Sequence, residues 1–159
     1  MERVIPLREE DWATLREIRL AALKHDPGAF GSTLDREQGY DQETWCSRLG
    51  ASRWFMALDG GQPCGIVAGR NADRPDEREL ISLWVDPGHR GRGLARLLVE
   101  SIIGWARLQG ARRLLLWVVD ENDGAQRLYA RTGFRPTGRH KLVPRDPPLP
   151  ELEMALELI

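Results

Sequence analysis

Apolar and polar positions follow two different periods along the chain, and together they predict strands alternating with helices. Alternating or continuous apolar runs predict strands at 4–7, 53–58, 63–69, 78–85, 112–119 and 151–158, with one more beginning at 134. Apolar stripes with helical spacing predict helices at 9–25, 42–49, 93–109 and 122–132. The segments 27–39, 71–77 and 141–150, rich in polar, Gly or Pro residues, are expected to be loops.

The order of these elements predicts a mixed α/β sheet. Asp59-Gly60-Gly61 is a turn sequence between two strand patterns, which favours an antiparallel hairpin. The second half alternates strand, helix, strand, helix and strand, which favours a parallel βαβ unit with helices on both faces of the sheet. The helix at 93–109 is expected to bury one apolar stripe, formed by Leu94, Leu97, Leu98, Ile102, Trp105 and Leu108.

Length and composition fit one globular domain, 1–159. The chain has 159 residues, of which 42% are hydrophobic and 30% charged, and no apolar run approaches the roughly 20 residues of a membrane span. The formal net charge of −1 gives no reason to expect nucleic acid or a membrane as the main partner. The start of the chain is too polar for a signal peptide, and Cys46 and Cys64 fit neither a metal site nor a disulfide framework. A cytoplasmic protein with free thiols and no metal is therefore expected.

The strongest chemical signal is a glycine-rich turn between the strand at 78–85 and the following long helix. The first turn of a helix has unpaired backbone N–H groups and a partial positive charge. Gly91 and Gly93 let a ligand approach these groups, and Arg90, Arg92 and Arg96 are expected to add positive charge. The turn is neither a GxxxxGK[ST] loop nor a complete GxGxxG fingerprint.

A second segment, Asn122 to Phe134, follows one strand later, and the two segments together resemble the signature of the GNAT acetyltransferase family. The first is similar to the family's V-x-P-x-x-R-G-x-G-x-A pyrophosphate loop and the second to its N-x-x-A-x-x-L-Y-x-x-x-G-F helix. The resemblance covers 78–134 well. It implies a GNAT-like fold: a twisted mixed sheet of six to seven strands and about four helices, splayed by a bulge at the cofactor-binding strand.

The resemblance implies acetyl-CoA as the cofactor and CoA as the product. Backbone N–H groups at the loop would hold the pyrophosphate, the strand end would pair with pantetheine, and the second helix would contact the pantetheine arm and a CoA phosphate. The implied residues are Leu83, Trp84, Val85, Arg90, Gly91, Arg92, Gly93, Leu94, Ala95, Arg96, Asn122, Ala125, Tyr129 and Arg131. Asn122 is also a good helix N-cap, and Tyr129 would serve equally as a core tyrosine.

The resemblance also places Tyr129 beside the CoA sulfur, where a phenol can protonate the departing thiolate; Tyr129 is expected to be the general acid. Many relatives carry a glutamate about where Ser82 stands, so a direct base at that position is in doubt. Strand alternation would put Glu79 on one face with Ile81 and Leu83, with Ser82 opposite, unless a bulge alters the phase. Glu79 acting through water is the working hypothesis for the base, and a backbone N–H near Leu83 is the candidate oxyanion donor.

The acceptor pocket is expected in the segments 27–39 and 140–150, which flank the acetyl end in this family's architecture. The candidate substrate-binding residues are Phe30, Gly31, Ser32 and His140. His140 is also an alternative base. Phe30 and Trp84 are candidates for apolar walls, and both would also serve as ordinary core residues.

The predicted function is N-acetyl transfer from acetyl-CoA to a primary amine of a small molecule or peptide, by direct attack in a ternary complex. The alternative is a non-catalytic acyl-CoA-sensing module on the same fold. A nucleic-acid binder using 89–96 is opposed by the net charge. Homodimers are frequent in the family, but no residue pattern here demonstrates one.

Overall fold

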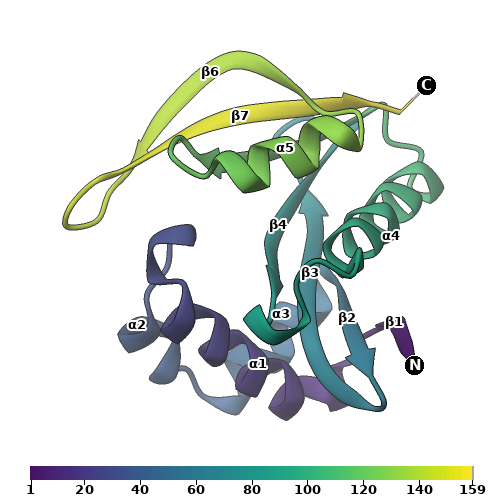
Figure 1. The fold of residues 1–159 in the computed structure, drawn as a ribbon, viewed down its shortest axis with the longest axis vertical. Helices are drawn as coiled ribbons and strands as arrows, with labels where there is room; N and C mark the ends of the chain where they lie inside the picture. Colours follow the sequence, from purple (N-terminus) through teal and green to yellow (C-terminus); the bar gives the residue numbers. More distant parts are fainter. Residues whose placement is uncertain (159) are drawn as a thin grey trace.

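A computed structural model describes residues 1–158 and contains one seven-stranded mixed sheet with helices on both faces (Figure 1). The strand order is β1-β2-β3-β4-β5-β7-β6. The strands are β1 (Glu2–Pro6), β2 (Arg53–Asp59), β3 (Gln62–Asn71), β4 (Glu77–Val85), β5 (Arg113–Val119), β6 (Arg135–Val143) and β7 (Leu149–Glu157). The helices are α1 (Trp12–His25), α2 (Leu34–Gln38), α3 (Gln42–Ala51), α4 (Leu94–Leu108) and α5 (Asp123–Arg131).

The connections confirm the predicted mixed sheet. β4 and β5 are parallel and joined through α4, whereas every other neighbouring pair is antiparallel. The Asp59-Gly60-Gly61 turn closes the β2–β3 hairpin, with both glycines at positive φ. A parallel pair needs a crossover, and α4 supplies it.

Two hydrophobic clusters occupy the two faces of the sheet. Under α4 and α5, the first contains Leu98, Ile102 and Tyr129; under α1 and α3, the second contains Leu15 and Trp45. Fully burying one such side chain contributes about 1.5–3 kcal/mol, so both layers are held by apolar burial. No helix among the described residues combines the length and apolar character that a membrane crossing requires.

Two predictions about the buried stripe of α4 are wrong. Leu97 is 45% and Leu108 is 89% exposed, whereas Leu98, Ile102 and Ala106 are fully buried. The buried stripe therefore runs at four-residue spacing from Leu94 and is joined by Val99 and Ile103, which turns the two leucines toward solvent.

Two predicted loops contain regular structure. The segment 27–39 holds a 3₁₀ turn at Pro27–Ala29 and the helix α2, whose N-cap Thr33 accepts a hydrogen bond from the backbone N–H of Arg36. The predicted loop 141–150 is shortened to 144–148, because β6 and β7 pair up to Val143 and Leu149. Cross-strand pairing in this hairpin outweighs the local loop signal of its prolines.

Candidate active site

The glycine-rich loop joins β4 to α4 in the conformation that its glycines permit. Gly91 and Gly93 have φ values of +81° and +82°, in the left-handed region that residues with a side chain rarely adopt. No heavy atom lies within 4 Å of where a Cβ would stand on either residue. The loop is therefore open on this side, and its glycines are required by backbone conformation rather than by crowding.

The backbone N–H groups of residues 91–96 form a continuous row without acceptors among the described residues. Leu97 is the first to donate within the helix, to the carbonyl of Gly93 at 3.1 Å. The earlier N–H groups are the unpaired donors of a helix N-terminus, where the helix dipole also favours an anion. We call residues 91–96 the anion cradle; its geometry fits the pyrophosphate predicted for it.

The three predicted arginines, two in the loop and one in the first turn of α4, are paired with carboxylates. Arg90 lies 2.8 Å from Asp26, Arg92 lies 3.3 Å from Asp59, and Arg96 lies 2.9 Å from Glu100. Each guanidinium group is thus partly neutralised by a carboxylate, and the expectation that these side chains add positive charge at a ligand stays a prediction. The backbone N–H groups of the anion cradle, in contrast, have no acceptor among the described residues.

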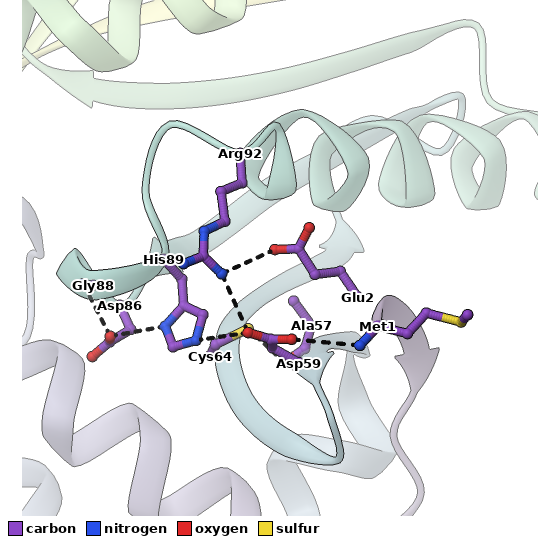
Figure 2. A network of polar contacts seen from close by, with 9 residues as sticks. All are labelled: Met1, Glu2, Ala57, Asp59, Cys64, Asp86, Gly88, His89 and Arg92. Atoms are coloured by element: carbon purple, nitrogen blue, oxygen red, sulfur yellow. Dashed lines mark hydrogen bonds and ion pairs between the residues drawn. The ribbon is translucent and has the colours of Figure 1, made fainter.

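A polar network fixes the base of this loop to the β2–β3 hairpin (Figure 2). The ring of His89 lies between two carboxylates, with Nδ1 3.1 Å from Asp86 and Nε2 3.2 Å from Asp59. Asp59 also lies 3.7 Å from the amino group of Met1. Cys64, below this network, is fully buried, and burial raises the pKa of its thiol. A thiol held neutral is unreactive, which agrees with its interpretation as a small core residue.

β4 separates from β5 directly before the anion cradle. The two strands pair only where Glu77–Glu79 face Arg113–Leu115. In the β3–β4 ladder, Val67 faces two residues, Ser82 and Leu83, and Ser82 has a φ of +62°. This is a β-bulge, and bulges bend a strand and disrupt its pairing. The β5-facing edge of β4 is therefore unpaired over 81–85, where the pantetheine is predicted.

The bulge also corrects the predicted side-chain phase of β4. Ile81 packs against the cluster under α1, but Leu83 packs against the cluster under α4. The extra residue at the bulge shifts the alternation by one, so Leu83 does not share a face with Ile81. Trp84 consequently packs under α1, where its indole N–H donates to Asp26 at 2.7 Å.

α5 brings its predicted residues to the sheet face that also carries α4. Asn122 is the N-cap, and its Oδ1 accepts a hydrogen bond from the N–H of Ala125 at 3.0 Å. Tyr129 is 7% exposed and packs edge-on against Phe134, with ring centroids 5.8 Å apart. Burial raises the pKa of Tyr129, so its phenol stays protonated well above neutral pH.

A cavity of about 650 Å³ opens where β4 and β5 part. Of the predicted acceptor residues, Phe30, Gly31 and Ser32 line it, and so does the predicted base Glu79. The two predicted segments meet at its rim, since Arg145 donates to the carbonyls of Pro27 at 3.1 Å and Phe30 at 2.6 Å. The prediction that these segments flank one pocket is thus consistent with their contact.

Two other acceptor candidates do not line this cavity. The side chain of His140 is 64% exposed and lies 3.9 Å from Asp120. The second, Trp84, is a core residue, 5% exposed. Trp84 follows the bulge at Ser82, and His140 follows a register shift in the β6–β7 ladder; neither irregularity is visible in a single local pattern.

Comparison with known proteins identifies the family. A family model described as "Acetyltransferase (GNAT) family" matches residues 12–134. The chain belongs to the GNAT family. It is 33% identical to a mycothiol acetyltransferase of Beutenbergia cavernae over 134 residues, which cover 83% of this chain and 43% of that protein. It is 34% identical over 95 residues to an uncharacterised N-acetyltransferase of Methanocaldococcus jannaschii, covering 57% and 42% respectively.

The chain thus spans about two fifths of the length of these GNAT relatives. Solved structures show the same fold. A GNAT acetyltransferase from Streptococcus pneumoniae matches with a TM-score of 0.84 at 22% identity, over all of both chains. A putative acetyltransferase, yncA, from Salmonella typhimurium, solved with its cofactor acetyl-CoA, matches with a TM-score of 0.81 at 22% identity. This match covers all of this chain and 95% of that one.

The cavity of this GNAT domain also contains charged residues that sequence reasoning missed. They come from six different elements: Arg19, Arg36, Glu37, Arg48, Arg70, Lys141 and Glu151. Of the two cavity carboxylates on the sheet, Glu151 is the more buried, with 10% of its side chain exposed. Burial raises the pKa of Glu151. The charge of Lys141 opposes this rise, and the charges of Glu79 and Asp120 add to it. The alternation of Glu151 and Glu153 with apolar residues along β7 is the signal that could have found it.

Arg131 lies at the other end of α5. It lines a separate cavity of about 360 Å³ with Arg96, Glu100 and Arg107 from α4. The predicted contact of Arg131 with a CoA phosphate therefore stays a prediction, now associated with the α4–α5 groove.

Proposed function

We propose that this chain is an N-acetyltransferase that moves an acetyl group from acetyl-CoA to a primary amine of a small molecule or peptide. The observation that carries the proposal is one continuous arrangement. The anion cradle at 91–96 follows the unpaired edge of β4, and that edge borders the cavity containing Glu79. Direct transfer requires three parts: a binding site for the cofactor phosphates, an unpaired strand edge for pantetheine, and a cavity for the acceptor.

Binding of the cofactor would rest on backbone groups. The N–H groups of the anion cradle, residues 91–96, would hold the pyrophosphate, and the edge at Leu83–Val85 would pair with the amides of pantetheine. Asn122 and Ala125 at the start of α5 would border the same arm. Bound acetyl-CoA would supply an activated acetyl thioester.

Glu79 is the proposed base, acting through a water molecule. An amine attacks only when neutral, and an amine with a pKa near 10.4 is neutral in about one molecule per thousand at pH 7. Glu79 lines the cavity, and its carboxylate accepts a hydrogen bond from Arg70 Nε at 3.0 Å, which supports its place there. The carboxylate would take the proton that the amine loses.

Tyr129 is the proposed general acid. Its raised pKa keeps the proton on Oη, so the phenol would be in the protonated form that a general acid requires. A backbone N–H of Leu83–Val85 would donate to the developing oxyanion, since this edge of β4 is unpaired. We further propose that the protein acts in the cytoplasm, where its two free cysteines would stay reduced.

The test is acetyl-CoA-dependent thiol release with a panel of amines: free amino acids, their amides, polyamines, aminoglycosides and peptides. Saturable release with at least one amine, with intersecting initial-rate lines for a ternary complex, is expected. Tight acetyl-CoA binding without transfer to any amine would overturn the catalytic proposal in favour of a sensing module. Ping-pong kinetics would overturn direct attack.

A further inference from the structure

We infer that the acceptor is a small amine that also carries an anionic group, as an amino acid does. This inference rests on the proposed acetyl transfer and names the class of its substrate. It comes from the charges of the cavity of about 650 Å³, whose two walls differ. We call them the sheet wall (Arg70, Glu79, Trp117, Lys141 and Glu151) and the helical wall (Arg19, Ser32, Arg36, Glu37 and Arg48).

The sheet wall is balanced in charge and contains the carboxylates. Arg70 pairs with Glu79 at 3.0 Å, and Lys141 lies 3.8 Å from Glu151. Among the described residues, Lys141 is the only side chain that pairs with the carboxylate of Glu151. An ammonium group would find two carboxylates here, beside Ser82 at the opening between β4 and β5.

The helical wall has a surplus of positive charge. Glu37 is the one carboxylate shared by two guanidinium groups, with contacts of 2.9 Å to Arg19 and 2.7 Å to Arg48. Arg36 forms no ion pair among residues 1–158 and is exposed. Three arginines therefore face one carboxylate, which leaves two positive charges uncompensated on this wall.

Two buried polar atoms of the helical wall also lack partners among residues 1–158. Arg19 Nη1 and Ser32 Oγ make no hydrogen bond within this part of the chain, although Arg19 Nε and Nη2 are both bonded to Glu37. A buried donor without a partner is unfavourable, so a bound ligand with acceptors would be favoured beside these atoms. An anionic ligand supplies acceptors, and charge-assisted hydrogen bonds to arginine are the strong ones.

The position of the acetyl end then orients the acceptor. The reacting amine must lie where β4 and β5 part, against the sheet wall, so the rest of the molecule extends toward the helical wall. A polyamine or an aminoglycoside would place a second cation against surplus positive charge, which is unfavourable. A carboxylate at that end is attracted. The cavity of about 650 Å³ is large enough to hold such a molecule.

The experiment compares free L-amino acids with the same compounds as C-terminal amides, using thiol release. Amidation leaves the amine in place and removes the anionic group. We expect kcat/KM at least 10-fold higher for the acid of the best pair. We also expect Arg36→Glu to raise the KM of that acid at least 10-fold, with little change for the amide. Arg36→Lys should restore binding, and Lys24→Gln, at an exposed site on α1 outside the cavity, is the control.

The outcomes separate the two proposals. Transfer to amides, polyamines or aminoglycosides with equal or greater efficiency would overturn the inference and leave acetyl transfer standing. Transfer to no amine in the panel would overturn the proposed function and this inference with it. Equal KM changes for acid and amide in Arg36→Glu would show a structural effect and would also overturn the inference.

Discussion

The guanidinium group of Arg90 lies 2.8 Å from the carboxylate of Asp26, although 64 positions separate them. The Nε atom of Arg90 also donates to the carbonyl of Val85 at 2.9 Å, and Trp84 donates to the same Asp26 oxygen at 2.7 Å. Asp26 follows the end of α1, so one carboxylate joins this helix to the end of β4 and to the loop that opens the anion cradle. The position of the cradle therefore depends on the first half of the chain.

Asp26→Asn is expected to weaken acetyl-CoA binding by about 3- to 10-fold, because the start of the loop loses its charged partner. Burial works against ionisation of Asp26, but hydrogen bonds from Trp84 and Arg90 outweigh it and lower its pKa. A lowered pKa stabilises the fold above the ordinary value of 3.8, and this contribution disappears as pH falls through the folded-state pKa. The variant should thus be less stable than the parent at pH 7 and converge with it in acid.

Calorimetric titration with CoA and thermal melts between pH 3 and pH 7 measure both effects. The matched control is Asp73→Asn, an exposed aspartate in the β3–β4 connection. Equal affinity in the Asp26 and Asp73 variants would refute the role of Asp26 in setting the loop.

Gly93→Asp is expected to abolish measurable CoA binding, a loss of at least 100-fold. Gly93 has a φ of +82° and open space at its Cβ position, so the new carboxylate would stand at the N-terminus of α4 and repel a phosphate. Part of the effect could come from backbone strain alone. Gly110, past the other end of α4, has a φ of +75° and open space as well, so Gly110→Asp reproduces the strain without touching the cradle.

Isothermal titration with CoA distinguishes the two variants. Gly110→Asp should bind CoA like the parent while losing a similar amount of thermal stability, about 1 kcal/mol. If both variants lose affinity together, strain in α4 is responsible and the anion cradle is not the binding site.

Tyr129→Phe is expected to lower kcat by about 100-fold or more and to change the CoA affinity less than twofold, because a general acid contributes mainly to the transition state. The ring packing against Phe134 is retained, so the melting temperature should hardly move. The raised pKa of Tyr129 further predicts that kcat shows no alkaline decline from this phenol below about pH 10. Stopped-assay thiol release against pH tests this, and an unchanged kcat in the variant would assign the acid to another group.

Features encoded within a few neighbouring residues could be predicted from the sequence. Gly91 and Gly93 ahead of an apolar stripe predicted the loop and α4, and Asn122 was expected to cap α5, as it does. The Asp59-Gly60-Gly61 turn predicted its hairpin. In each case the conformation is decided by local backbone chemistry.

Features that depend on contacts between residues distant in the sequence could not be predicted from it. Glu37 makes the segment 27–39 look like a polar loop, yet it is buried in α2 because Arg19 and Arg48 neutralise it. The bulge at Ser82 depends on pairing with β3, so the predicted phase of Leu83 was wrong. The charged lining of the cavity comes from seven elements, and only the tertiary fold assembles it.

Glu37→Gln is expected to destabilise the protein by about 3–5 kcal/mol, because it leaves two guanidinium groups facing one another without a carboxylate. Despite burial, which opposes ionisation, hydrogen bonds and charges from Arg19 and Arg48 lower the pKa of Glu37 from 4.5 to about 2. A lowered pKa stabilises the fold above pH 4.5, by about 3 kcal/mol here, and that contribution is lost as pH falls from 4.5 through 2.

Urea unfolding of the parent protein and of Glu37→Gln measures this contribution. The difference in unfolding free energy between the two proteins should be about 2 kcal/mol smaller at pH 3 than at pH 7. A difference that stays constant over this range would mean that the lost interaction is not the ionised carboxylate. Glu43→Gln, in the exposed first turn of α3, is the control and should change stability by less than about 0.5 kcal/mol at either pH.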